Sequence, residues 1–276
     1  MITSVANNKV KRVVTLQEKS RARAKENVFV AEGIKMFEEA PITGMQELYI
    51  EESLYAELCK KPIGDKIEEC RQSGVFVETV SQEVFQRMSD TQTPQGILCV
   101  MERFSHTCDK VIADAEKRRK EEGRAPLFLV LEDIQDPGNL GTMIRTAEGA
   151  GADGIIMSRG TVDIYNPKTI RSTMGSLYRM PFCYVQELSE VIEKLKGAGI
   201  TVYAAHLMGE KYYHQIDYGS GAAFLIGNEG NGLKKETADL ADSYLKIPME
   251  GKLESLNASI AAAILMYQAA VTRKDS

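Results

Sequence analysis

The chain has 276 residues, of which 43% are hydrophobic and 26% are charged, an ordinary globular composition for one or two domains. Its formal net charge of −5 argues against indiscriminate nucleic-acid binding. No run reaches the roughly 18 apolar residues of a membrane span. The five cysteines lack a C-x-x-C pair and no secretory leader is visible, so we expect reduced thiols, no metal site and a cytoplasmic protein.

The first 25 residues are strongly basic, with seven Lys and Arg residues against one acid, Glu18. An acidic protein with one basic segment engages phosphates at one face only. Lys9, Lys11 and Arg12 are therefore candidate phosphate contacts. A solvated basic helix is an equally good interpretation of charge alone.

Residues 1–105 alternate short β-type runs with helix-like stretches, which predicts a small N-terminal α/β/α layer domain. The β-type runs are residues 28–30, 48–50, 75–77 and 96–100. Residues 106–125 are dense in charge, and we predict a charged linker there, or an exposed helix running into one.

Residues 126–276 alternate again, beginning with a near-continuous apolar run at 127–131 that is typical of a buried parallel strand. Further strands are expected at residues 154–157, 182–185, 201–204, 223–226 and 244–247. Helices are expected at about 139–150, 167–178, 187–198, 233–241 and 255–272. The pattern predicts a parallel-sheet α/β domain with helices on both faces and ligands at the carboxyl ends of the strands.

Two turns follow strands in this half, at residues 227–232 and 247–259. Glycine lets a backbone approach a ligand closely, so such turns build a pocket from main-chain groups. The first turn reads G-x-x-G-x-G, and neither the dinucleotide spacing nor the lysine of a P-loop is present. The pocket is expected to hold something other than a dinucleotide or a nucleoside triphosphate.

Polar residues that follow the predicted strands are candidates for chemistry. Asn139 is expected as a helix N-cap, and Arg145 shares a helix face with Gly141. Glu229 lies between two glycines, and Ser255 is expected to cap the last helix. Taken one at a time, each residue also has a purely structural interpretation, as a helix cap, a turn residue or a surface ion-pair partner.

Together, three segments resemble the motifs of the SpoU (TrmH) RNA 2′-O-ribose methyltransferases. They are Asn-x-Gly-x-x-x-Arg at 139–145, Gly-Asn-Glu-Gly at 227–230, and Ile-Pro-Met followed by Ser-Leu-Asn-x-Ser at 247–259. They occur in the family's order, over roughly residues 127–272. The joint match is much more specific than any one motif.

The N-terminal half is similar to the RNA substrate-binding domain often joined to this family. Phe-Val-Ala-Glu-Gly-Ile-Lys at 29–35 matches its F-x-x-E-G-x-K/R signature. The resemblance implies RNA contacts at Glu32 and Lys35, in addition to the candidates Lys9, Lys11 and Arg12 that the charge of the first 25 residues indicates.

The resemblance also implies a deep trefoil knot in the catalytic domain, bound S-adenosylmethionine, a homodimer through that domain, and no metal. The implied catalytic positions are Arg145, Asn139, Glu229, Ser255 and Asn257. The implied cofactor contacts are Leu225, Gly227, Gly230, Ile247, Met249 and Leu256.

The implied reaction transfers a methyl group to a ribose 2′-hydroxyl, which must lose its proton. Arginine is a poor base because its pKa exceeds about 12. We therefore expect Arg145 to fix the target phosphate and polarise the hydroxyl, with Glu229 as an alternative proton acceptor. Large-subunit (23S) ribosomal RNA is the expected substrate. Transfer RNA, or a non-catalytic role in RNA binding or ribosome assembly, are the alternatives, and the glycine spacing disfavours an oxidoreductase.

Overall fold

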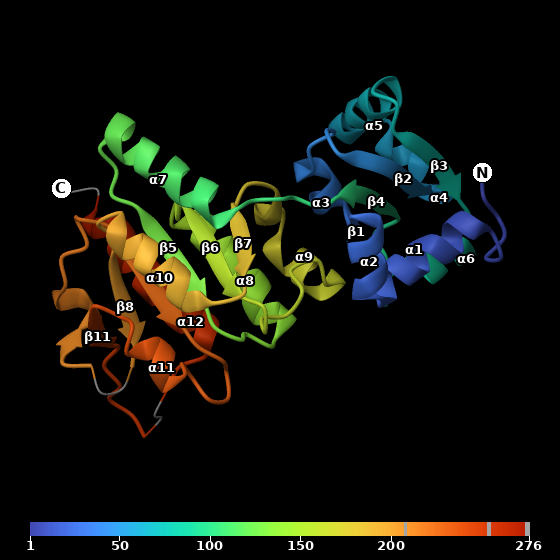
Figure 1. Cartoon of the computed structure of the whole chain (residues 1–276). Helices are drawn as coiled ribbons and strands as arrows, with labels where there is room; N and C mark the ends of the chain where they lie inside the picture. The colour runs from blue at the N-terminus through green and yellow to red at the C-terminus, as the bar shows by residue number, and fades with distance from the viewer. Residues whose placement is uncertain (207–208, 253–254, 274–276) are drawn as a thin grey trace. The chain divides into compact units, whose positions relative to one another are not determined.

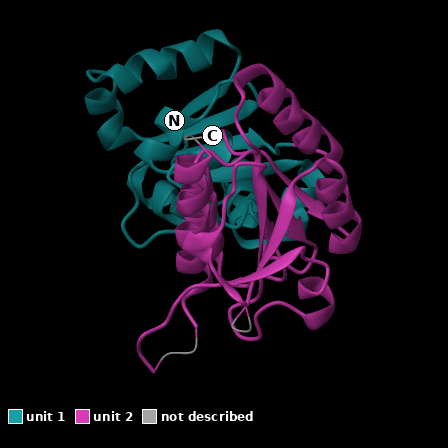
Figure 2. Ribbon diagram, turned by 90° about the vertical axis from the view of Figure 1, so that its left-hand side faces the viewer, with its two compact units in different colours: residues 1–104, 163–178 teal, residues 105–162, 179–276 magenta. Residues whose placement is uncertain are grey.

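The computed structural model describes residues 1–206, 209–252 and 255–273, and the chain forms two compact units (Figures 1 and 2). Unit 1 comprises Met1–Phe104 and Asp163–Tyr178. Unit 2 comprises Ser105–Val162 and Arg179–Ser276. Neither unit is a single continuous stretch of sequence.

Unit 1 is built on a four-stranded mixed sheet in the order β1-β4-β2-β3, in which only β2 and β3 are parallel neighbours. The strands are β1 (Val28–Glu32), β2 (Met45–Glu51), β3 (Phe76–Val80) and β4 (Ile97–Glu102). The helices are α1 (Asn8–Glu18), α2 (Ser20–Glu26), α3 (Ile34–Glu39), α4 (Glu52–Leu58), α5 (Pro62–Gln72), α6 (Gln82–Met88) and α9 (Pro167–Thr173). Every residue of β1 is buried, as expected for a strand covered on both faces. All four predicted strands are confirmed.

The segment Asp163–Tyr178 belongs to unit 1, although the sequence predicts it as part of the C-terminal domain. The ring of Tyr165 lies 4.9 Å from that of Phe29 on β1. Buried Arg23 forms a 2.7 Å ion pair with Asp163 and also donates to the carbonyl oxygen of Leu16. The predicted continuous domain 1–105 is therefore incomplete, because Tyr165 and Asp163 of this later segment contact Phe29 and buried Arg23.

Unit 2 contains a seven-stranded sheet in the order β7-β6-β5-β10-β8-β11-β9, with every pair of neighbours parallel. The strands are β5 (Leu127–Leu131), β6 (Gly154–Ser158), β7 (Phe182–Val185), β8 (Thr201–Ala205), β9 (Lys211–Tyr212), β10 (Ala222–Ile226) and β11 (Ser243–Lys246). The predicted parallel α/β fold is confirmed, and β9 is the strand that the sequence pattern missed.

Helices cover both faces of this sheet. Alternate residues of the central strands, such as Phe128, Val130 and Leu225, pack with α7 and α10 in one core, whereas α8 and α12 pack against each other and against the sheet. The helices are α7 (Cys108–Glu122), α8 (Pro137–Gly149), α10 (Leu188–Gly197), α11 (Lys235–Ala238) and α12 (Ala258–Thr272). The near-continuous apolar character of β5 and β10 follows from this double coverage.

Of the two alternatives for residues 106–125, the structure supports a helix, because most of the segment is α7, although one face of this helix is buried. Val111, Ile112 and Ala115 are buried in the core of unit 2, and the dense charge lies in the second half of the helix. These three residues, at positions i, i+1 and i+4, form one apolar helix face. The charged residues that follow them make this short apolar face difficult to recognise in the sequence.

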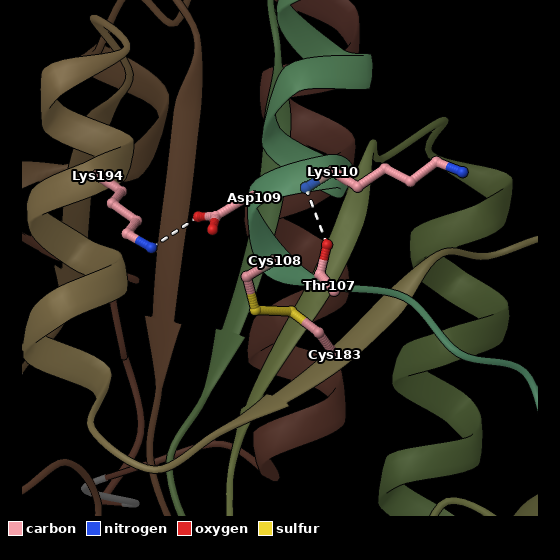
Figure 3. The surroundings of a disulfide bond; sticks show 6 residues. All are labelled: Thr107, Cys108, Asp109, Lys110, Cys183 and Lys194. Atoms are coloured by element: carbon pink, nitrogen blue, oxygen red, sulfur yellow. Dashed lines mark hydrogen bonds and ion pairs between the residues drawn. A yellow bond between two sulfur atoms is a disulfide. The ribbon is translucent and has the colours of Figure 1, made fainter.

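The expectation that all five cysteines are thiols is also wrong. Cys108, at the start of α7, forms a disulfide with Cys183 on β7, across a Cα–Cα distance of 5.7 Å (Figure 3). The two residues are 75 positions apart in sequence, so only the packing of α7 beside β7 brings them together. Cys59, Cys70 and Cys99 are free.

Two helix starts differ from the predicted ones. The N-cap of α8 is Asp136, whose carboxylate accepts the N–H of Asn139 at 2.8 Å. Pro137 occupies the first turn, where its missing N–H costs nothing. The N-cap of α12 is Asn257, not Ser255, and its side-chain oxygen accepts the N–H of Ser259 at 2.8 Å.

Candidate active site

A cavity of about 670 Å³ opens at the carboxyl ends of β8, β10 and β11 in unit 2. This is the end of a parallel sheet at which ligands bind, and the volume is that of a small-molecule site. Its walls are the turn after β10, the segment after β11, and the start of α12. The predicted site residues in its lining are Gly227, Glu229, Gly230, Ile247, Met249, Ser255, Leu256 and Asn257.

The turn after β10 folds tightly back on itself. A Cβ atom added to Gly227 would lie 2.1 Å from the backbone of Gly232 and of Leu233, which no packing tolerates. Asn228 fixes the turn, since its side-chain oxygen accepts the N–H of Gly230 and its amide donates to the carbonyl oxygen of Asp133, both at 2.8 Å. The sequence analysis explains this glycine by the close approach of a ligand. In the structure, the close approach of the backbone at Gly232 and Leu233 already requires glycine at this position.

Glu229 is bonded to the loop that precedes α8. Its carboxylate accepts the N–H groups of Gln135 and Asp136 and the side-chain amide of Asn139, each at 3.0 Å. Burial acts to raise the pKa of Glu229, but these hydrogen bonds outweigh it and the pKa is lowered. A carboxylate held in its charged form is a weak base, so the geometry disfavours Glu229 as the proton acceptor.

A chain of hydrogen bonds joins the three sequence motifs. The amide of Asn139 donates to Glu229, and its oxygen accepts the side-chain amide of Asn257 at 3.0 Å. The oxygen of Asn257 then caps α12. Residues about 90 and 118 positions apart are thereby fixed relative to one another.

Arg145 lies on α8 outside the lining of the cavity and is exposed. Within residues 1–206, 209–252 and 255–273, its side chain has no recorded hydrogen-bond or ion-pair partner. Its guanidinium is therefore open to an anion supplied from outside the chain.

Two carboxylates after β5 brace the other side of the turn. Buried Glu132 accepts the hydroxyl of Thr237 at 2.5 Å and the N–H of Lys234 at 2.8 Å. Asp133 accepts the Lys234 ammonium and the Ser158 hydroxyl, which together lower its pKa. The sequence analysis did not single out these residues, although they directly follow a predicted strand.

The cavity lining departs from the prediction at other positions too. Leu225 is completely buried within β10 and does not reach the cavity, because alternate strand residues face the helices. His206 and Lys246 do line it, and the ring of His206 lies 5.2 Å from that of Tyr244. His206 directly follows β8 and lies two residues beyond the predicted strand 201–204, so the rule that ligands bind at carboxyl ends would have found it.

In unit 1, the carboxylate of Glu32, a predicted RNA contact, is hydrogen-bonded within its own unit. Its buried carboxylate accepts the hydroxyls of Ser89 at 2.5 Å and Thr91 at 2.9 Å, and the N–H of Asp90 at 3.1 Å. A charged group with its acceptors occupied by its own chain has little left for a ligand. The neighbouring Gly33 has φ +113°, a backbone conformation that favours glycine.

The predicted basic contacts of unit 1 are partly neutralised by acids of the same unit. Lys9 and Arg12 lie 3.2 and 3.0 Å from the two oxygens of Glu47, and Arg12 also pairs with Glu26. Lys35 pairs with Glu39 at 2.6 Å. The remaining predicted contact, Lys11, is exposed on α1.

Among the residues that the structure describes, no three His, Cys, Asp or Glu side chains are grouped as metal ligands. In the same part of the chain, no helix is long and apolar enough to cross a membrane.

Comparison with known proteins agrees with this geometry. The model of the SpoU rRNA methylase family matches residues 126–267. RlmP of Bacillus subtilis (strain 168), a 23S rRNA (guanosine(2553)-2′-O)-methyltransferase, is 33% identical over 268 residues, covering 96% of this chain and 97% of that protein. The chain belongs to the SpoU rRNA methylase family. The resemblance predicted from the three motifs is confirmed.

One further comparison extends over both halves of this family member, and another matches its N-terminal half. The AdoMet-bound rRNA methyltransferase of Sinorhizobium meliloti is 29% identical, with a TM-score of 0.81 and coverage of 97% and 96% of the two chains. The model of the MRM3-like substrate-binding domain matches residues 7–99, in agreement with the predicted N-terminal domain.

Proposed function

We propose that this protein transfers a methyl group from S-adenosylmethionine to a ribose 2′-hydroxyl of large-subunit ribosomal RNA. The observation that carries the proposal is the hydrogen-bond chain from Glu229 through Asn139 to Asn257, which assembles all three family motifs beside the cavity. The near full-length similarity to RlmP favours 23S ribosomal RNA over transfer RNA. A non-catalytic role is disfavoured because Arg145 and the Glu229 turn are both present.

The cavity fits the cofactor. Its turns offer main-chain groups for hydrogen bonding, and Ile247, Met249 and Leu256 offer apolar side chains for the adenine ring. The bound cofactor would supply an activated methyl group on a sulfonium. The tight return of the chain at Gly227, with β10 lying between β5 and β8, supports the further proposal that this region is knotted.

Arg145 acts on the RNA. Its planar guanidinium can bind the phosphate beside the target nucleotide in two hydrogen bonds and polarise the 2′-hydroxyl. Asn139 is held in one orientation by its two partners, so it fixes the start of the helix that carries Arg145. The hydrogen bonds that Glu229 accepts from the N–H groups of Gln135 and Asp136 make that residue an anchor for this loop.

A second copy of the chain is proposed to cover α12. Ile260, Tyr267 and Val271 are 49%, 50% and 60% exposed, and their spacing of seven and four residues places them on one helix face. Three large apolar side chains in a row on one exposed face mark an interaction site. The same face on each copy would form a symmetric interface.

Val271→Asp should convert the homodimer to a monomer, because a buried carboxylate at the interface is costly to desolvate. Light scattering at micromolar concentration gives the mass. The matched control is Val5→Asp, which places the same charge at an exposed valine of unit 1. A wild-type protein that is active as a monomer contradicts the dimer.

Binding of the cofactor product, S-adenosylhomocysteine, tests the proposed function. A ligand present at 100 times its Kd stabilises the native state by about 2.7 kcal/mol, so the melting temperature should rise, whereas NAD should leave it unchanged. Mapping of ribose methylation in RNA from cells with and without the gene then identifies the nucleotide. No shift with S-adenosylhomocysteine, or an identical methylation map, contradicts the proposal. Since the proposed substrate is ribosomal RNA, we also propose a cytoplasmic location.

A further inference from the structure

Three arginines surround Asp153 in unit 2, at the amino ends of β5 and β6 and therefore at the opposite edge of the sheet from the cavity. Arg118 comes from α7, Arg124 precedes β5, and Arg273 follows α12. We call these four residues the Asp153 cluster. It has no part in the active site described above.

The charges of the Asp153 cluster do not balance. Asp153 is 1% exposed, and one of its carboxylate oxygens accepts a hydrogen bond from Nη2 of Arg124 at 2.9 Å and forms an ion pair with Nη2 of Arg118 at 3.0 Å. Its other oxygen accepts the N–H of Leu127 at 2.8 Å and lies 3.8 Å from Nη1 of Arg273. Three guanidinium groups share one carboxylate, which leaves two positive charges uncompensated by it.

Arg273 is the structural member of the cluster. It is buried and donates to the carbonyl oxygens of Ala125, Ala150 and Gly151 at 3.1, 2.8 and 2.7 Å. Burial lowers its pKa, and the positive charge of Arg124 lowers it further. An additional anion near the cluster would relieve this repulsion.

Arg118 and Arg124 remain accessible, with side chains 34% and 31% exposed. Each bonds to Asp153 through Nη2 only, and no acceptor for Nη1 of either is recorded in the described part of the chain. Lys194 and Lys196 on nearby α10 differ, because each has carboxylate partners of its own, Asp109 for the first and Glu193 and Asp242 for the second. The Asp153 cluster therefore has more positive groups than carboxylates, whereas each of these two lysines on α10 has a carboxylate partner.

We propose that Arg118 and Arg124 bind a backbone phosphate of the substrate RNA, at a nucleotide remote from the methylated one. The choice of RNA rests on the proposed function, and the planar guanidinium fork suits phosphate oxygens. The five residues of β5 separate the cluster from the active-site edge by about 16 Å. A contact at that distance adds to RNA affinity and leaves the reacting groups unchanged.

The double variant Arg118→Gln/Arg124→Gln tests this contact. Affinity for a 23S rRNA transcript is measured over a series of KCl concentrations. Each lost phosphate contact lowers the log–log salt slope by about 0.7–0.9, so the variant, which loses one phosphate contact, should bind more weakly and lose about 0.7–0.9 from the slope. The rate at saturating RNA should stay at the wild-type value.

The control is Lys194→Gln/Lys196→Gln, which removes the same formal charge from cations that have their own carboxylates. Its slope should match the wild type. A lower melting temperature of the arginine variant with an unchanged slope would mean that the cluster only stabilises the fold, and would overturn the proposal. Stabilisation of the wild type by inorganic phosphate, together with that unchanged slope, would indicate a free-anion site and equally overturn RNA binding.

Binding of S-adenosylhomocysteine by the wild type is measured first. Without such binding the proposed function fails, whereas the salt slopes still test the arginine contact separately.

Discussion

Replacement of Arg145 by alanine should lower methyl transfer by about 100- to 1,000-fold, the loss seen when one preorganised donor to developing charge is removed. The side chain is exposed and open to an external anion, so its removal deletes a contact to RNA and none within the described protein. Arg145→Lys should also fail, because a point charge does not replace a planar fork. Single-turnover rates with saturating RNA and cofactor measure the effect.

Cofactor affinity separates this role from a structural one. Arg145 does not line the cavity, so the affinity of Arg145→Ala for S-adenosylhomocysteine should equal that of the wild type. The matched control is Arg179→Ala, which should keep full activity. Arg179 is also exposed, and it forms an ion pair with Glu148, which lies on α8 as Arg145 does. Wild-type turnover in the lysine variant would show that positive charge alone suffices.

Gly227→Ala should abolish cofactor binding. The added Cβ would lie 2.1 Å from the backbone of Gly232 and Leu233, so the turn must open, and the wall of the cavity moves with it. Gly230→Ala is the control in the same turn, because its nearest neighbour is the side-chain oxygen of Asn228 at 3.3 Å. Calorimetry with S-adenosylhomocysteine compares the two.

The expected pattern is loss of binding in Gly227→Ala and only a modest change in Gly230→Ala. Equal affinity in both variants and the wild type would mean that the turn after β10 does not form the cofactor site. A melting temperature measured without ligand shows how far the altered turn also destabilises unit 2.

Strand positions and the parallel sheet could be predicted because buried parallel strands are short, continuous apolar runs. The position of the site followed from the same rule, since the turns at Gly227 and Ile247 come directly after strands. The residues at which helices begin were harder to predict. Asp136 and Asn257 cap the helices in place of Asn139 and Ser255, because several polar residues in a row are all acceptable caps and only the backbone path selects one.

Polar residues were the least predictable part. Glu32 and Glu229 are similar in sequence, each a glutamate beside a glycine, and both prove to be bonded to loops of their own unit. A glutamate that binds a ligand and a glutamate that binds a backbone N–H of its own chain cannot be distinguished from the residues around them in a single sequence. The disulfide between Cys108 and Cys183 is equally hidden, because it depends on which helix packs beside β7.

The chain passes between the two units three times, after Phe104, after Val162 and after Tyr178. An appended RNA-binding module can ordinarily be removed by deleting one terminus, and a related enzyme can acquire it by a single gene fusion. Here a deletion of residues 1–104 would leave Tyr165 without Phe29 and Asp163 without Arg23. A truncation, or a hybrid with another substrate-binding unit, therefore has to remove or exchange the 163–178 segment together with residues 1–104.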